Sequence, residues 1–204
     1  MNLLRITYLQ LIAAGFLPIH PMNHAALARD EFKVMLFFRC NLPFPNLLSK
    51  CDRCSQPCAV EHALRCKKGG LMTACDDHLK LELANLFRDA LPQSHVKIEP
   101  ILPYSLDKND ANGLVDNVSV RNIWNDDKIS IFNIQLTYPF CKSNTNSDPG
   151  TLLKSKEKKK KAKHVKRCRE HKLNFTPCAA SINLIIGDEF KRLTKNIAER
   201  LEKK

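Results

Sequence analysis

The sequence predicts an α/β protein with a small cysteine-rich module in front of the main fold. Apolar residues recur at helical spacing in residues 73–91 and 188–203, and short runs between them alternate apolar and polar residues. Five of the nine cysteines fall within residues 51–75. Because 44% of the 204 residues are apolar, the chain has enough hydrophobic side chains for a core.

Two helices are predicted around the cysteine-rich module. The first spans 23–40, with Asn23 as its N-cap, and ends before a segment with two prolines. The second spans 73–91, with Thr73 as its N-cap and Pro92 beyond its end. Its apolar stripe comprises Leu79, Leu83, Leu86 and Ala90.

Three short strands are predicted after the second helix. Their alternating apolar residues are Val96 and Ile98, Val118 and Val120, Ile129 and Ile131, and Ile134 and Leu136. The alternation of the third strand changes phase near Phe132, which predicts a β-bulge. A last strand over 175–186 and a last helix over 188–203 complete a mixed sheet flanked by helices.

The positive charge of the chain is concentrated in one segment. The whole chain has 33 Lys and Arg against 21 Asp and Glu, whereas residues 154–172 alone have eleven basic and two acidic residues. We expect this segment, helical or disordered, to bind the phosphates of DNA or RNA without reading sequence, because nothing near it would read base edges. No aromatic residue lies in it, so base stacking is not supported. A solvated charged helix and a nuclear localisation signal are the alternatives. The predicted contacts are Lys158, Lys159, Lys160, Lys161, Lys163, Lys166 and Arg167.

The cysteine-rich module has the spacing of a zinc site. Cys51, Cys54, His62 and Cys66 follow the pattern C-x2-C-x7-H-x3-C, which supplies four ligands for a tetrahedral structural zinc ion. Cys58 lies inside the loop and is an alternative ligand. Because no thioredoxin-like strand precedes the CxxC pair, a redox role is disfavoured. Unrelated buried or free thiols are the remaining alternative.

The organisation of the chain follows from these features. We predict an N-terminal helical segment over 1–50, the zinc knuckle over 51–70 and the main core over 71–204. No run of about 18 apolar residues predicts a membrane span. The polar residues near the start do not favour a signal peptide, so we expect a nuclear or cytoplasmic protein. A short amphipathic helix, or a start codon inside an older and longer reading frame, also fits this segment.

Polar residues in the predicted core indicate a possible catalytic centre. Asn133 and Gln135 lie on one face of the third strand, and Asp116 and Asn117 stand just before the second. His78 and Glu82 lie one turn apart on the helix. A helix acid, a strand Asp and an acid-x-Lys on the next strand form the layout of the metal-dependent PD-(D/E)XK nucleases, in which carboxylates bind Mg²⁺.

The motifs of the chain resemble one particular family. From about Leu27 onward the segments ARDEFKVMLFFRC, CDRC with HALRCKKGG, VKIEP, VSVRNIW, IFNIQLTYP, EKKKK, FTP and FKRL follow one another. They resemble the C-terminal segment of non-LTR retrotransposon polyproteins, where a CCHC knuckle directly precedes a restriction-enzyme-like endonuclease. The resemblance implies a PD-(D/E)XK fold and a basic segment that faces nucleic acid. The reverse transcriptase of such polyproteins has no counterpart here, since no YxDD-type motif occurs.

The departures from the family concern its catalytic positions. Asn117 stands where the family has Asp, Asn133 and Gln135 stand where it has Asp and a basic residue, and His78 stands where Glu is usual. Amides are weaker Mg²⁺ ligands than carboxylates, and a glutamine provides no positive charge. We therefore predict a degenerate site without cleavage activity. The carboxylates that remain are Glu82, Glu99 and Asp116.

Three functions are compatible with these observations. The chain is expected to be a retrotransposon-derived, zinc-binding protein that binds DNA or RNA without cutting it. The alternatives are an active Mg²⁺-dependent DNA endonuclease and a zinc-knuckle adaptor for a protein partner. No membrane partner or small-molecule substrate is indicated. A reading frame that never accumulates as protein also fits the sequence.

Overall fold

A computed structural model describes most of the chain beyond the N-terminal segment. The described residues are 33, 37, 42, 49–51, 53–58, 62, 66, 68, 71–102, 114–139, 148–181 and 185–203. The helix predicted over 23–40 and the predicted segment 1–50 lie largely outside these residues.

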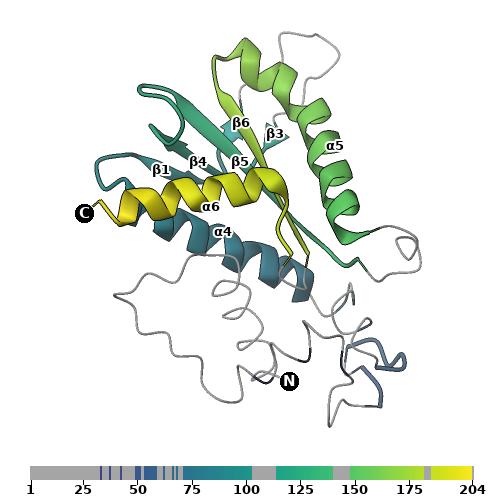
Figure 1. Cartoon of the computed structure of the whole chain (residues 1–204). Helices are drawn as coiled ribbons and strands as arrows, with labels where there is room; N and C mark the ends of the chain where they lie inside the picture. Colours follow the sequence, from purple (N-terminus) through teal and green to yellow (C-terminus); the bar gives the residue numbers. More distant parts are fainter. Residues whose placement is uncertain are drawn as a thin grey trace.

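The described core is a mixed α/β fold, which confirms the predicted fold class. A four-stranded sheet has the order β1-β4-β5-β6, in which only the β5–β6 pair is parallel, and β2 and β3 form a separate two-stranded sheet. Three helices flank the larger sheet (Figure 1). The elements are α4 (Leu71–Ala90), β1 (Val96–Ile98), β2 (Ile101–Leu102), β3 (Leu114–Val115), β4 (Val118–Arg121), β5 (Ile129–Thr137), α5 (Pro149–Glu170), β6 (Asn174–Ser181) and α6 (Asp188–Leu201).

Helices α4 and α6 cover one face of the sheet. They contact each other and lie side by side in Figure 1. Their inward residues recur every three or four positions, so each helix buries one apolar stripe. This main core includes Leu79, Leu83 and Phe87 of α4, Phe190, Leu193 and Ile197 of α6, and Phe132, Ile134 and Leu136 of β5.

Strand β5 is buried on both faces. Its even-numbered residues face α4 and α6, whereas Ile131 packs with Cys168 of α5 on the other face. The pairing of β5 with both neighbours is continuous in register, so the bulge predicted near Phe132 is wrong. Apolar residues appear in both phases because helices cover both faces, which removes the simple alternation of a half-exposed strand.

The basic segment forms the helix α5, which connects the parallel strands β5 and β6. Parallel neighbours require a crossover, and α5 provides it. Asp148 caps its start by accepting a hydrogen bond from the Thr151 N–H at 3.0 Å. At its end Lys172 has a φ of 57°, and the Leu173 N–H donates to the Cys168 carbonyl at 2.8 Å, which is a Schellman-type stop.

The last strand is shorter than predicted. β6 ends at Ser181 because the chain then turns back, and Ile186 forms an antiparallel bridge with Ala180. The Gly187 N–H donates to the Ala179 carbonyl at 2.8 Å, and α6 begins immediately afterwards. Among the described residues, every helix is too short or too polar to cross a bilayer.

Candidate metal centre and nucleic-acid interface

The first two cysteines of the knuckle lie in a tight hairpin. Lys50 and Pro57 form an antiparallel bridge, and the Ser55 N–H donates to the Cys51 carbonyl at 2.8 Å. Ser55 has a φ of 60°, which turns the chain back just after Cys54. The turn therefore brings both thiols of the CxxC pair to the same side of the loop.

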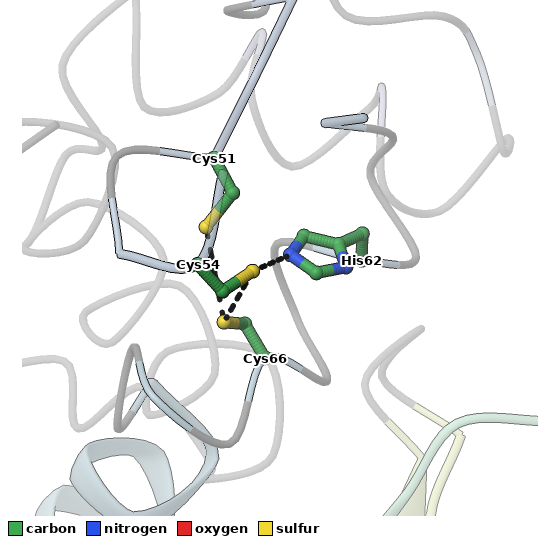
Figure 2. A group of neighbouring side chains, drawn as sticks. All are labelled: Cys51, Cys54, His62 and Cys66. Carbon is green, nitrogen blue, oxygen red and sulfur yellow. Dashed lines mark hydrogen bonds between the residues drawn. The ribbon is translucent and has the colours of Figure 1, made fainter. Parts of the chain in front are cut away.

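Four side chains converge on one point at this hairpin. The ligand atoms of Cys51, Cys54, His62 and Cys66 all lie within 4.8 Å of one another (Figure 2). The sulfur of Cys66 lies 3.8 Å from that of Cys51 and 3.7 Å from that of Cys54. Zn–S bonds of about 2.3 Å at tetrahedral angles place two sulfurs about 3.8 Å apart. The thiol spacing therefore fits a zinc ion.

One edge of the cluster is shorter than a zinc site requires. The Cys54 sulfur and the His62 Nε2 atom are 3.0 Å apart, whereas zinc bonds of ordinary length would separate them by about 3.6 Å. A small outward movement of the ring would give the tetrahedral spacing. Cys58, the alternative ligand, is not a member of the cluster, and none of the described cysteines forms a disulfide.

Backbone donors around the thiols prepare the knuckle for a metal. N–H groups of Arg53 and Cys54 that donate to the Cys51 sulfur lower the pKa of Cys51 to about 6. The N–H of Gln56 acts in the same direction at Cys54, but loss of hydration and the neighbouring thiols raise the pKa of Cys54 overall. One thiolate is thus available near neutral pH, and a cation would favour the others.

A buried polar cluster lies between the sheet and α5. The Asn133 amide donates to Oδ1 of Asp116 at 2.5 Å, and Nδ1 of His164 lies 3.1 Å from Oδ2 of the same carboxylate. All three residues are at least 94% buried. The imidazole also stacks on Phe175, with ring centroids 4.8 Å apart. These contacts attach α5 to the sheet.

Asp76 of α4 is a polar residue of this region that the sequence-based reasoning missed. It accepts a hydrogen bond from the Leu136 N–H, on the part of β5 that extends beyond β4. Burial raises the pKa of Asp76 to about 6. The carboxylates of Asp76 and Asp116 both act electrostatically on the half-buried ammonium of Lys160. No sequence motif marked Asp76, because only the packing of α4 against β5 reveals it.

Several polar atoms in the region of Asp116 have no hydrogen-bond partner among the described residues. The Nε2 atom of His164 is one of them. Oδ1 of Asn133 and Oδ1 of Asp76 are two more. Buried acceptors normally find a donor or a cation.

The remaining predicted catalytic positions have separate roles. Asn117 accepts a hydrogen bond from the Ile134 N–H at 2.5 Å, which satisfies the same free edge of β5. Gln135 is half-buried and shares the α5-facing side of β5 with Asn133. His78 and Glu82 of α4 pair with each other at 3.9 Å. Helix α4 covers the face of the sheet opposite to the one that α5 covers. The structure thus joins Asn133 with Asp116, and no described contact connects them to His78 or Glu82.

Glu99, the other acid left near the site, has a structural partner. Its carboxylate accepts a hydrogen bond at 2.7 Å from the buried Lys80, which also pairs with Asp77 at 2.6 Å. Burial works against the charge, but these hydrogen bonds raise the pKa of Lys80 overall. Glu99 has a φ of 51°, and the ion pair holds this strained residue against α4.

The outer side of α5 is rich in basic residues. Its exposed positions from 154 onward recur every three or four residues, as one face of a helix does. They comprise Lys154, Ser155, Lys158, Lys159, Ala162, Lys163, Lys166 and Arg169. We call this set the outer face of α5. The two acids of the helix, Glu157 and Glu170, are not on it, because Glu157 is buried and Glu170 is partly buried.

Three of the predicted nucleic-acid contacts lie away from the outer face. Lys160 and Lys161 are only partly exposed, and Arg167 is 94% buried. Burial and the nearby Lys163 lower the pKa of the Lys160 ammonium, although the carboxylates of Asp116 and Asp76 act against this. The basic residues that are consecutive in the sequence therefore fall into two groups on the helix, one exposed and one partly or fully buried.

The structure defines a mixed α/β protein whose described residues include a Cys₃His cluster suited to a metal ion. Comparison of the chain with protein-family models, curated proteins and solved structures gives no match.

Proposed function

We propose that the chain is a nucleic-acid-binding protein that holds DNA or RNA on the outer face of α5 and does not cut it. The outer face of α5, which contains no acid of that helix, is the main observation in favour. Six basic residues span about 22 Å of helix axis, a length over which duplex DNA presents many phosphates. Neutralising several of them releases counterions, which drives binding without sequence readout.

A relationship to the endonuclease segment of non-LTR retrotransposon polyproteins is part of this proposal. It is supported by the quoted motifs, by a ligand cluster with CCHC spacing directly before α4, and by a mixed sheet with helices on both faces. In this role the knuckle would be a structural zinc module. A metal ion would order a loop that has little hydrophobic core of its own.

The absence of cleavage is proposed from the chemistry of β5. Asn133 is an amide whose nitrogen is already donating to Asp116, and Gln135 provides no positive charge on the same strand face. Asp76 and Asn117 satisfy backbone donors of β5. A Mg²⁺ site for phosphodiester cleavage needs carboxylates that are close together and free to bind the ion.

Equilibrium binding tests this proposal. Fluorescence anisotropy with labelled duplexes of unrelated sequence should give similar affinities for all of them. A triple variant, Lys158→Ala with Lys159→Ala and Lys163→Ala, should weaken binding to every duplex alike. The matched control removes three exposed lysines elsewhere, Lys97, Lys128 and Lys203. Equal losses in the two variants would contradict a specific role of α5.

A metal-dependent nuclease is the second candidate, and one observation favours it. Oδ1 of Asn133 and Oδ1 of Asp76 are buried acceptors without a described partner, and the carboxylates of Asp76 and Asp116 both act on Lys160. In this case Asp76 and Asp116 would bind Mg²⁺, and Lys160 would supply the charge that Gln135 lacks. Nicking of supercoiled plasmid in Mg²⁺ or Mn²⁺ that is abolished by Asp116→Asn would establish this function and exclude the first.

A further inference from the structure

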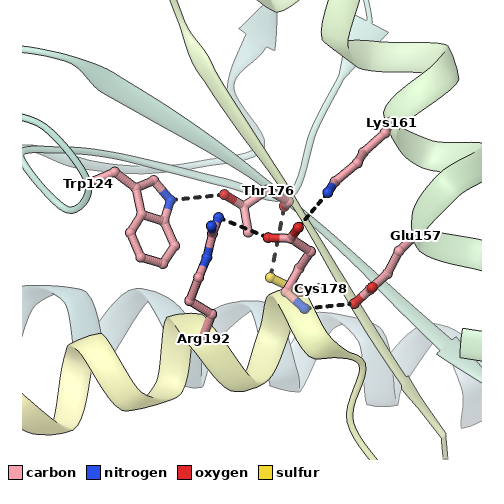
Figure 3. Close-up of polar contacts among 7 residues, drawn as sticks. Trp124, Glu157, Lys161, Thr176, Cys178 and Arg192 are labelled. Atoms are coloured by element: carbon pink, nitrogen blue, oxygen red, sulfur yellow. Dashed lines mark hydrogen bonds and ion pairs between the residues drawn. The ribbon is translucent and has the colours of Figure 1, made fainter. Parts of the chain in front are cut away.

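The first turn of α6 places two acids beside the basic helix. Asp188 lies 3.4 Å from the ammonium of Lys154, and Glu189 forms an ion pair with Lys161. Glu189 also pairs with Arg192 at 2.9 Å (Figure 3). Two lysines of α5 therefore already have carboxylate partners on α6.

The position of this acidic turn is fixed by the fold. Glu157 of α5 is 94% buried and accepts a hydrogen bond from the Glu189 N–H at 3.2 Å (Figure 3). Gly187 allows this approach, because a Cβ atom there would lie 2.1 Å from Oε1 of Glu157. The start of α6 is thus capped by a side chain of α5, and the acids remain next to Lys154 and Lys161.

Three lysines on the outer face differ from this pair. Lys158, Lys159 and Lys163 are exposed, and no ion pair joins them to a carboxylate of the described residues. They lie within two turns of Lys161 on the same helix. Some lysines of α5 thus have a carboxylate partner, and these three have none among the described residues.

We propose that the acidic first turn of α6 marks one boundary of the nucleic-acid interface and withholds Lys161, and in part Lys154, from phosphate contact. The backbone of a bound duplex then follows Lys158, Lys159 and Lys163. A phosphate approaching Lys161 would meet the charge of Glu189, and one approaching Lys154 would meet that of Asp188, so repulsion disfavours that side. The inference rests on the proposed nucleic-acid binding.

The two lysines should not be withheld equally. Lys154 and Asp188 are 68% and 61% exposed, so water screens their attraction and a phosphate can compete with it. Lys161 and Glu189 are 44% and 19% exposed, and Glu189 has Arg192 as a second partner. Lys161 is therefore the more firmly held, and it is the better residue for a test.

Single alanine variants on one helix provide that test. Binding of a fluorescein-labelled duplex is measured by anisotropy between about 50 and 200 mM KCl. Lys158→Ala and Lys163→Ala should each reduce the slope of log K against log salt by about 0.9, because each removes one phosphate contact. Lys161→Ala should leave the slope unchanged. A reduction by Lys161→Ala equal to that of the other two would overturn the boundary.

Removal of the acids gives a second, independent readout. Glu189→Gln should free Lys161 and steepen the slope by up to about 0.9, and Lys161→Ala in this background should reverse the gain. Glu199→Gln is the matched control, since it makes the same charge change at the other end of α6. An equal effect of Glu199→Gln would show that only net charge matters and would refute the inference.

Two controls keep the result interpretable. Fluorescence of Trp124, the single tryptophan of the chain, reports whether the α5–α6 region stays folded. Asp188→Asn changes a 61% exposed residue, so it should not affect folding and should strengthen binding through Lys154. If the wild-type protein binds no duplex, both the proposed function and the boundary fail. If Lys158→Ala and Lys161→Ala weaken binding equally, only the boundary fails.

Discussion

The substitution Asn133→Asp tests the buried contact between Asn133 and Asp116. In the native structure the amide nitrogen donates to Oδ1 of Asp116 at 2.5 Å, and the two residues are 6% and 1% exposed. A carboxylate of the same shape would place two acceptor oxygens against each other. Two carboxylates at such a distance cannot both be ionised without a cation between them.

The cost of Asn133→Asp follows from these distances. A hydrogen bond to a charged group contributes about 1.5–3 kcal/mol, and the variant loses it. Alternatively the introduced carboxyl stays protonated and donates to Asp116, and each unit by which its pKa rises then costs about 1.4 kcal/mol. If the pKa rises by about two units, either of these outcomes lowers the free energy of unfolding by roughly 3 kcal/mol at pH 7.5. This is a large part of the stability of a typical domain.

The pH dependence of this cost has a definite sign. An acid whose pKa is raised in the folded state causes no loss of stability below its pKa in the unfolded chain, which is about 3.9 for Asp. The loss grows as the pH rises toward the folded pKa and is constant above it. The difference in the free energy of unfolding between wild type and Asn133→Asp should therefore be small near pH 4 and full at pH 7.5.

Urea unfolding followed by the fluorescence of Trp124 measures this difference at both pH values. Gln135→Glu is the control, because it adds a carboxylate two residues further on the same strand face, at a half-buried position. Millimolar Mn²⁺ should recover part of the loss in Asn133→Asp at pH 7.5, since a cation can bridge the carboxylates. A variant as stable as the wild type at pH 7.5 without metal would refute the reasoning.

Other substitutions test the knuckle, the core and the junction of α5 with α6. Cys51→Ser should abolish binding of about one zinc ion per chain, measured by native mass spectrometry. Phe132→Ala should cost about 3–5 kcal/mol in urea unfolding, because the ring is fully buried. Gly187→Ala should cost about 1–3 kcal/mol by displacing Glu157 from its hydrogen bond, and much less when Glu157 is also Ala. Burial raises the pKa of Cys168 to about 12, so iodoacetamide should label this thiol only after unfolding, as peptide mass spectrometry would show.

The repeating patterns of the sequence were sufficient to predict the main elements of the fold. The stripe with Leu79 and Leu83 is the buried face of α4, and the Cys₃His cluster has the four predicted members. Both features are local, since they depend on spacing within one segment. The expected bulge near Phe132 was wrong because burial on both faces of β5 produces the same pattern as a change of phase.

The parts of the site that depend on tertiary packing were not predictable in this way. Asp76 receives the Leu136 N–H because α4 packs against the part of β5 that extends beyond β4. The run of lysines gave no sign that Lys161 is paired while Lys158 is free of a described ion pair, since the partner, Glu189, is 28 residues away. Charge counts along the chain cannot distinguish these states.

The salt dependence of duplex binding measures the α5 interface most directly. Wild type and the triple variant at Lys158, Lys159 and Lys163 are compared, together with the control variant at Lys97 and Lys128 and Lys203, over about 50–200 mM KCl. Binding through the outer face of α5 predicts that the α5 variant loses about 2.7 from the slope of log K against log salt, and that the control loses little. Equal slopes for the wild type and the α5 variant would contradict a nucleic-acid interface on this helix.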